Sequence, residues 1–148
     1  MRRWLMPAVA LALVAAGATG CGRDHAMKAE AAPAAFVKPF AGDAPHVPLL
    51  EGPPQTCGMR SGRVLLKQGE DCGEHTTGAH EECLVVLEGR GEARVQGRAP
   101  MKVEAGSAVY VPPHTTHCVY NVDCPVLRYV YVVAPVTARG VASEPHAH

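Results

Sequence analysis

Histidines and one glutamate stand out as residues whose types and spacing suit metal binding. His75, His80 and Glu82 fall within one short stretch, and His117 follows later in the chain. Neutral imidazoles and a carboxylate suit divalent transition metals such as Fe, Mn, Zn, Ni or Cu. The sequence therefore predicts a site for one such ion, provided that the fold brings these side chains together.

The residues around Glu82 and His117 alternate as they do in strands. Since successive side chains of a strand point to opposite faces, Glu82 shares a face with Leu84 and Val86. His117 shares a face with Val119 in the same way. An unpaired charge among apolar neighbours is very costly to bury, and a metal ion held by neutral imidazoles offsets that cost. If the two strands are neighbours in a barrel, Glu82 and His117 converge inside it.

The stretch that contains His75 and Glu82 fits a known pattern. Beginning at Gly69, the segment GEDCGEHTTGAHEECLVVLEG has the spacing G-x5-H-x-T-x4-E-x6-G, with His75, Thr77, Glu82 and Gly89 at the marked positions. It resembles the first motif of the cupin family. That family has a second histidine where this chain has Thr77.

A second segment, GSAVYVPPHTTHCVYN, resembles the second cupin motif, G-x5-P-x-G-x2-H-x3-N. The matching positions are Gly106, Pro112, His117 and Asn121, and His114 stands where the motif has its inner glycine. The resemblance covers roughly residues 64–134. It implies an all-β fold, a single cupin barrel (a double-stranded β-helix, or jelly roll).

Two ligand sets remain open because Thr77 offers only a hydroxyl, a poorer ligand than imidazole for these metals. His80 lies two residues before Glu82, on the same strand face, and could supply the missing imidazole. The ligands would then be His75, His80, Glu82 and His117. If His80 points out of the mouth instead, two histidines and one carboxylate remain, as in the facial triad of non-haem iron sites, with open positions for substrate or oxygen.

The resemblance also limits the classes of function to consider. It implies a metal-dependent enzyme acting on a small molecule, as in cupin dioxygenases, isomerases and decarboxylases, with His114 or an unligated His80 as a general base. A binding or sensing module for a small molecule is the alternative, and a purely structural scaffold is a third. No residue pattern assigns a catalytic residue or chooses a reaction.

Short segments of strand character, separated by Gly, Pro or Asn-Asp turns, predict a sandwich or barrel. Residues 126–134 are nearly all β-branched, aromatic or aliphatic, so this strand should lie well inside the sheet. The expected strands are residues 64–67, 82–88, 93–96, 101–104, 107–111, 116–121 and 126–134.

Residues 1–20 read as an export signal, with a positively charged start, an apolar run and a small-residue cleavage site. Cys21 follows directly, so the site resembles the lipobox of bacterial lipoproteins, in which that cysteine is lipidated. Ala18 stands where the lipobox usually has Leu, and ordinary cleavage at the same place is the rival interpretation. We expect an exported protein of the cell envelope, anchored to its membrane by lipid alone and facing the periplasm or the exterior.

Composition divides the rest of the chain. Residues 21–50 are rich in Ala and Pro and predict a linker, residues 51–138 the barrel, and residues 139–148 a flexible tail. With 14 basic and 14 acidic residues the chain has no charge excess to attract nucleic acid. An exposed strand edge invites another chain, so we expect a homodimer.

The cysteines are the remaining reactive side chains. An oxidising compartment allows disulfides. The pair Cys118 and Cys124 flanks a predicted turn and is the most plausible bridge, although spacing alone does not decide connectivity.

Overall fold

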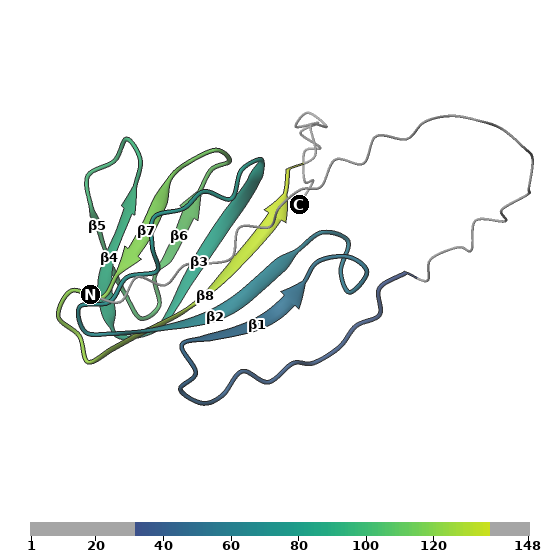
Figure 1. Cartoon of the computed structure of the whole chain (residues 1–148), viewed down its shortest axis with the longest axis horizontal. Coiled ribbons are helices and arrows are strands. Elements are labelled where there is room, and N and C mark those ends of the chain that lie inside the picture. Colours follow the sequence, from purple (N-terminus) through teal and green to yellow (C-terminus); the bar gives the residue numbers. More distant parts are fainter. Residues whose placement is uncertain (1–31, 137–148) are drawn as a thin grey trace, which may run out of the picture.

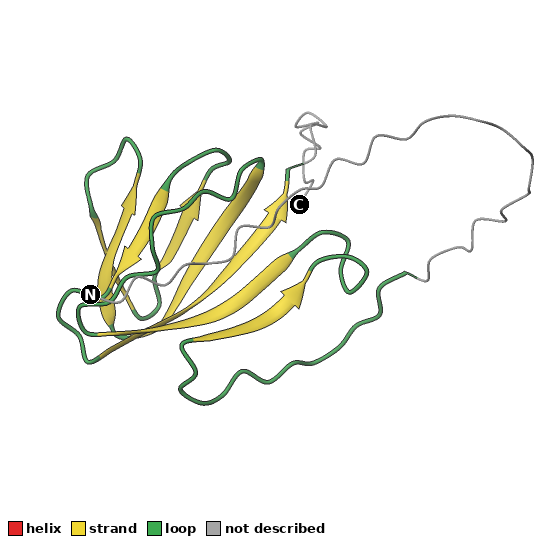
Figure 2. Cartoon of the chain, in the orientation of Figure 1, coloured by secondary structure: helices red, strands yellow, loops and turns green. Residues whose placement is uncertain are grey.

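The computed structural model describes residues 32–136, and every regular element in this range is a strand (Figures 1 and 2). The expected signal peptide, Cys21 and the tail from residue 139 lie outside the described residues. The strands are β1 (His46–Glu51), β2 (Arg60–Lys67), β3 (His80–Glu88), β4 (Arg90–Val95), β5 (Met101–Glu104), β6 (Ala108–Val111), β7 (His117–Tyr120) and β8 (Val126–Pro135). The predicted all-β fold is confirmed.

Two antiparallel sheets make up the domain. The five-stranded sheet has the order β1-β2-β8-β3-β6, and the three-stranded sheet has the order β5-β4-β7. Figure 1 shows the small sheet at one end of the molecule and β1 and β2 at the other. The arrangement is a jelly-roll sandwich.

The core lies between the sheets because each sheet turns an apolar face inward. Leu84 and Val86 of β3 and Leu127 of β8 pack from the larger sheet, and Ala93 of β4 and Val119 of β7 pack from the smaller one. Val86, Ala93 and Leu127 are almost completely buried. This core fixes the distance between the sheets and therefore holds the residues that project between them.

Strand β8 occupies the centre of the larger sheet, hydrogen-bonded to β2 on one side and to β3 on the other. Its buried residues Leu127 and Tyr129 belong to the core. The prediction that this apolar, β-branched segment lies inside the sheet is confirmed.

Strand β1 begins at His46, within the segment expected to be a linker. Its Pro48 hides the pattern, and this proline is tolerated because β1 is an edge strand whose register shifts between Pro48 and Leu50. The buried Arg63 of β2 holds the chain before β1 in place by donating hydrogen bonds to the carbonyl oxygens of Ala44 and Gly42. Ordered structure therefore reaches further towards the N-terminus than composition suggests.

The strands that carry Glu82 and His117 are not neighbours. Glu82 lies on β3 in the larger sheet and His117 begins β7 in the smaller sheet. The two side chains therefore meet across the interior from opposite sheets. Between residues 32 and 136 there is no helix long and apolar enough to cross a membrane.

Candidate metal centre

Three of the predicted ligands come together. His75, Glu82 and His117 each offer one ligand atom, and these atoms lie within 4.8 Å of one another. Within residues 32–136 they form the one group of this kind. Each member is held by a different element of the fold.

Glu82 projects from the middle of the larger sheet. Its strand neighbours are Val111 of β6 and Val133 of β8, both buried. The glutamate itself is only 3% exposed. A carboxylate in such apolar surroundings needs a cation or hydrogen-bond donors to offset its lost hydration.

His117 faces Glu82 from the opposite sheet. Its Nδ1 lies 3.1 Å from the carbonyl oxygen of Thr115, and since a carbonyl only accepts, Nδ1 carries the proton. Nε2 is then unprotonated and can bind a metal through its lone pair. It lies 3.1 Å from Oε2 of Glu82. With the proton on Nδ1, Nε2 has none to donate to the carboxylate, so both atoms are buried without a hydrogen-bond partner.

His75 completes the group from the segment before β3. It pairs with His117 as an isolated antiparallel bridge, and the two imidazole centroids are 4.4 Å apart. Its Nδ1 lies 2.9 Å from the carbonyl oxygen of Gly73, which leaves Nε2 unprotonated in the neutral ring. His75 is half-buried, so the group meets solvent through this residue.

The protonation of His75 is tied to a neighbouring thiol. A hydrogen bond with Cys72 is the largest cause that raises the pKa of His75 to about 9, against a lowering by burial. The Gly73 carbonyl and the charges of Cys72 and Glu82 raise the pKa further. A metal ion that binds here must therefore displace a proton below that pH.

The donor set fits a divalent transition metal. Two imidazoles with free nitrogen atoms and one carboxylate are a ligand set that these ions use. Backbone carbonyls orient metal-binding histidines through the other ring nitrogen, as Gly73 and Thr115 do here. The buried atoms without partners, Oε2 of Glu82 and Nε2 of His117, are the ones a cation would satisfy.

Comparison with known proteins agrees with this architecture. Residues 62–133 match the family model described as the cupin domain. This part of the chain is a cupin domain. A search of curated proteins found no match for the chain.

Solved structures share the cupin fold with this domain. An RmlC-like cupin family protein with a double-stranded β-helix fold from Methanocaldococcus jannaschii is 23% identical, with a TM-score of 0.56 over 68% of this chain and 91% of that one. A cupin 2 conserved barrel domain protein from Salinispora arenicola has the same identity of 23% and TM-score of 0.56, over 68% of this chain and 88% of its own. The Cnp3 cupin domain of Schizosaccharomyces pombe is 16% identical, with a TM-score of 0.55 over 62% of this chain and 64% of that chain. At these identities the likeness concerns the fold.

Backbone conformation explains why the motif has glycine at two positions of this cupin domain. Gly89 has a φ of 80°, and a Cβ there would lie 2.0 Å from the carbonyl oxygen of Val126, so only glycine fits. His114, at the motif's inner glycine, has a φ of 57°, a left-handed conformation that a side chain disfavours. The glycine of the motif is thus explained by the backbone, and this chain places a histidine there against that preference.

His80 does not join the group of three. It begins β3, half-buried, and its Nδ1 lies 3.2 Å from the carbonyl oxygen of Thr77. Thr77 in turn donates its hydroxyl to the carbonyl oxygen of His80 at 2.9 Å. The two residues that competed for the fourth ligand position therefore close a turn with each other, and the group has three donors.

The second candidate base, His114, lies on an exposed turn. Its backbone N–H donates to the carbonyl oxygen of Gly78, which joins the turn before β7 to the turn before β3. Its ring is exposed and is not a member of the group of three.

A polar pair that sequence analysis missed lies on the inner face of the larger sheet. Nε2 of His46 is 3.0 Å from the hydroxyl of Tyr131, and the two rings stack with centroids 5.9 Å apart. Burial is the largest cause that raises the pKa of Tyr131, followed by the charge of Glu82. Gly62 makes room for the pair, because a Cβ there would lie 2.7 Å from Tyr131. The alternation of β8 could have placed Tyr131 on this face, but His46 lay in a segment read as linker.

The expected disulfide between Cys118 and Cys124 is wrong for this structure, in which the five described cysteines form no disulfide. The sulfur of Cys118 instead lies 3.7 Å from that of Cys72. Hydrogen bonding from Cys118 is the largest cause that lowers the pKa of Cys72, and the same contact raises the pKa of Cys118. Sequence spacing favoured a hairpin partner, whereas the fold pairs β7 with the segment before His75.

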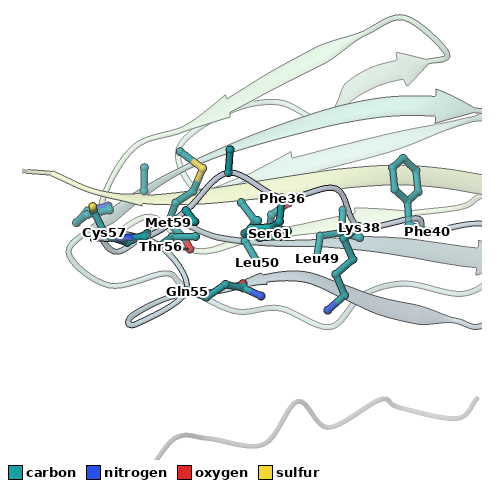
Figure 3. Close-up of a pocket in the computed structure, with 15 residues that line it drawn as sticks. Phe36, Lys38, Phe40, Leu49, Leu50, Gln55, Thr56, Cys57, Met59 and Ser61 are labelled. Carbon is teal, nitrogen blue, oxygen red and sulfur yellow. Dashed lines mark hydrogen bonds between the residues drawn. The ribbon is translucent and has the colours of Figure 1, made fainter. Parts of the chain in front are cut away.

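A surface pocket lies away from the metal centre, beside β1 (Figure 3). Its labelled lining includes Phe36, Phe40, Leu49 and Met59, and no member of the group of three lines it. The pocket is therefore separate from the chemistry described above.

Proposed function

We propose that this cupin domain binds one divalent transition metal ion through His75, Glu82 and His117, and uses it to act on a small molecule. The observation that carries the proposal is the pair of buried atoms without partners, Glu82 Oε2 and His117 Nε2, which meet from opposite sheets. A half-buried imidazole, His75, stands beside them. Such a set of atoms is costly to bury and a cation offsets that cost.

Catalysis is favoured over storage by the number of donors. Three protein ligands leave coordination positions for substrate and water, and a bound ion there supplies Lewis acidity or a site for a small ligand. A closed cage of four would favour a structural or storage role, and His80 does not close it.

The residues around the ion would orient its ligands and handle protons. The Gly73 and Thr115 carbonyls hold both histidines in the tautomer that presents Nε2. The pair of Tyr131 and His46 can hold a proton at the tyrosine hydroxyl, on the same inner face as Glu82. His80, at the start of β3, is the further base that a substrate entering by this end would meet.

Location and assembly are part of the proposal. The signal-like residues 1–20 and the lipobox-like Cys21 support an exported, lipid-anchored protein of the cell envelope. The exposed edge of β1 supports a homodimer, which sedimentation at several concentrations would test.

The test of the metal site is elemental analysis of purified protein. We expect about one equivalent of a transition metal in the wild type and a large loss in Glu82→Gln and His117→Gln. His114→Asn is the matched control, because it removes an exposed imidazole outside the group and asparagine tolerates the left-handed backbone. Negligible metal in the wild type, or unchanged metal in both site variants, would refute the assignment.

The catalytic part has its own test. With Mn²⁺ bound, water proton relaxation reports whether a coordinated water exchanges with solvent. Open positions predict strong relaxation enhancement that a small competing anion reduces. Bound Mn²⁺ without exchangeable water would leave metal binding standing and favour the binding or sensing module instead.

A further inference from the structure

We propose that Cys72 and Cys118 form a thiol–disulfide site, in which a small disulfide oxidant cross-links the segment carrying His75 to strand β7 beside His117. Their sulfur atoms are 3.7 Å apart. A disulfide has a sulfur–sulfur bond of about 2 Å, so a modest side-chain rotation brings them into bonding range.

The backbone brings the two cysteines together. Cys72 donates its N–H to the carbonyl oxygen of Val119, and the Val119 N–H donates to the sulfur of Cys72 at 3.2 Å. This backbone pairing continues as the bridges of Asp71 with Tyr120 and of His75 with His117. The two cysteines thus lie on adjacent, hydrogen-bonded segments, and the bond would need no rearrangement of the sheets.

No other described cysteine is placed in this way. Among residues 32–136, only Cys72 and Cys118 have sulfur atoms within hydrogen-bonding distance of each other. Cys83 lies on β3 opposite Tyr110 and Val132, on the face of the strand that does not carry Glu82. It therefore serves as a control cysteine.

Different exposure gives the two thiols different roles. Cys72 is partly exposed, whereas Cys118 is only 1% exposed. We assign Cys72 as the attacking thiol and Cys118 as the resolving one. Asp71 supports the second role, because its Oδ1 lies 3.8 Å from the sulfur of Cys118 and can accept that thiol's proton.

The reaction balances with glutathione disulfide as oxidant. The Cys72 thiolate attacks one sulfur of glutathione disulfide, which forms a mixed disulfide and releases one glutathione thiolate. Cys118 then attacks the Cys72 sulfur, forms the intramolecular bond and releases the second glutathione. Two protein thiols lose two electrons and two protons in total, and one glutathione disulfide becomes two glutathione molecules.

The bond would regulate the metal centre, and this part rests on the function proposed above. Cys118 directly follows His117, and Cys72 lies shortly before His75, so the cross-link ties together the two histidine-bearing segments. Holding the two histidines in place favours metal binding, so we expect oxidised protein to bind metal about tenfold more tightly than reduced protein, the scale of other changes around metal ligands.

The bond itself is tested on the full chain after equilibration with glutathione disulfide, alkylation of remaining thiols, proteolysis and mass spectrometry. We expect a cross-linked peptide joining Cys72 to Cys118 in the wild type and in Cys83→Ser. Cys118→Ser should accumulate glutathione on Cys72, whereas Cys72→Ser should leave Cys118 largely unmodified. Absence of the cross-link in the wild type, a predominant bond to another cysteine, or glutathione on Cys118 as readily as on Cys72 would overturn the proposal.

Metal titration of the oxidised and reduced wild type tests the regulatory part. Equal affinity in the two forms would overturn the link to the metal centre. Loss of the oxidation effect in both Cys72→Ser and Cys118→Ser, but not in Cys83→Ser, would support it. If neither form binds metal, the proposed function and the regulation both fail, while the peptide map still decides whether the disulfide site exists.

Discussion

His75 and His117 face each other as a backbone pair in which each residue donates its N–H to the other's carbonyl oxygen, at 3.1 and 2.9 Å. The pairing brings their imidazole centroids to 4.4 Å. Two ligands far apart in sequence are therefore fixed by main-chain hydrogen bonds, and only Glu82 has to arrive from the other sheet.

Metal affinity should rise with pH in the reduced protein. The pKa of His75 is raised to about 9, chiefly by its hydrogen bond with Cys72, and a protonated imidazole cannot bind a metal. Each binding event below that pH displaces this proton, so affinity should increase up to about tenfold per pH unit and level off near the pKa. Calorimetry in two buffers of different ionisation enthalpy would show the proton released.

Cys72→Ser provides the matched test of the cause. Without the thiol, the pKa of His75 should fall towards 6.5, the ordinary value of a histidine side chain, and the rise in affinity should level off at lower pH. Cys83→Ser should follow the wild type. A wild-type metal affinity that no longer rises with pH above pH 6.5 would contradict the influence assigned to Cys72.

The buried carboxylate should destabilise the metal-free protein. Glu82 is 3% exposed, and its Oε2 has no hydrogen-bond partner. Glu82→Met has a similar volume without the charge, so the metal-free variant should be more stable than the metal-free wild type by about 1–3 kcal/mol. Urea unfolding in the presence of a chelator measures the difference.

Metal should reverse this order. At a free metal concentration one thousand times the Kd, binding stabilises the wild type by about 4.1 kcal/mol, which exceeds the expected difference, and the variant should gain little. A metal-free Glu82→Met that is less stable than the wild type would mean that the carboxylate is satisfied within the protein itself.

The fold and the three-residue group were predictable for a definite reason. Strand alternation assigns Glu82 to the apolar face of its strand, and the motif spacing associates it with His75 and His117. Alternation decides the face of a side chain but not its distance from another strand. It therefore could not show that Glu82 and His117 approach from different sheets.

The features that escaped prediction depend on tertiary contacts. Strand β1 is hidden by Pro48, which an edge strand tolerates, and His46 was missed because it begins this strand. The partner of Cys118 was missed because Cys72 lies in a segment without strand character, which β7 nevertheless holds through backbone hydrogen bonds. Local pattern cannot identify such pairings.

His80 should be dispensable for metal binding. It shares a strand face with Glu82, but its Nδ1 lies 3.2 Å from the Thr77 carbonyl oxygen and it is not in the group of three. His80→Ala should therefore keep the metal Kd within about threefold of the wild type, whereas His75→Ala should weaken binding by about 100-fold or more, as loss of a direct ligand exceeds changes around it. Competition with a chelator of known affinity measures both. Equal losses in the two variants would show that His80 becomes a fourth ligand when metal is bound.

Glycine at position 114 should stabilise the domain. His114 has a φ of 57°, a conformation disfavoured for residues with a side chain, and its exposed imidazole is not a member of the metal group. His114→Gly should therefore raise the free energy of unfolding by about 0.5–1 kcal/mol, since relief of the backbone strain exceeds the greater freedom of glycine in the unfolded chain. His114→Ala is the control, because alanine removes the imidazole but keeps the strain, so its stability should stay close to that of the wild type. If alanine stabilises as much as glycine in urea unfolding, the gain comes from losing the imidazole and the backbone explanation of the motif's glycine is wrong.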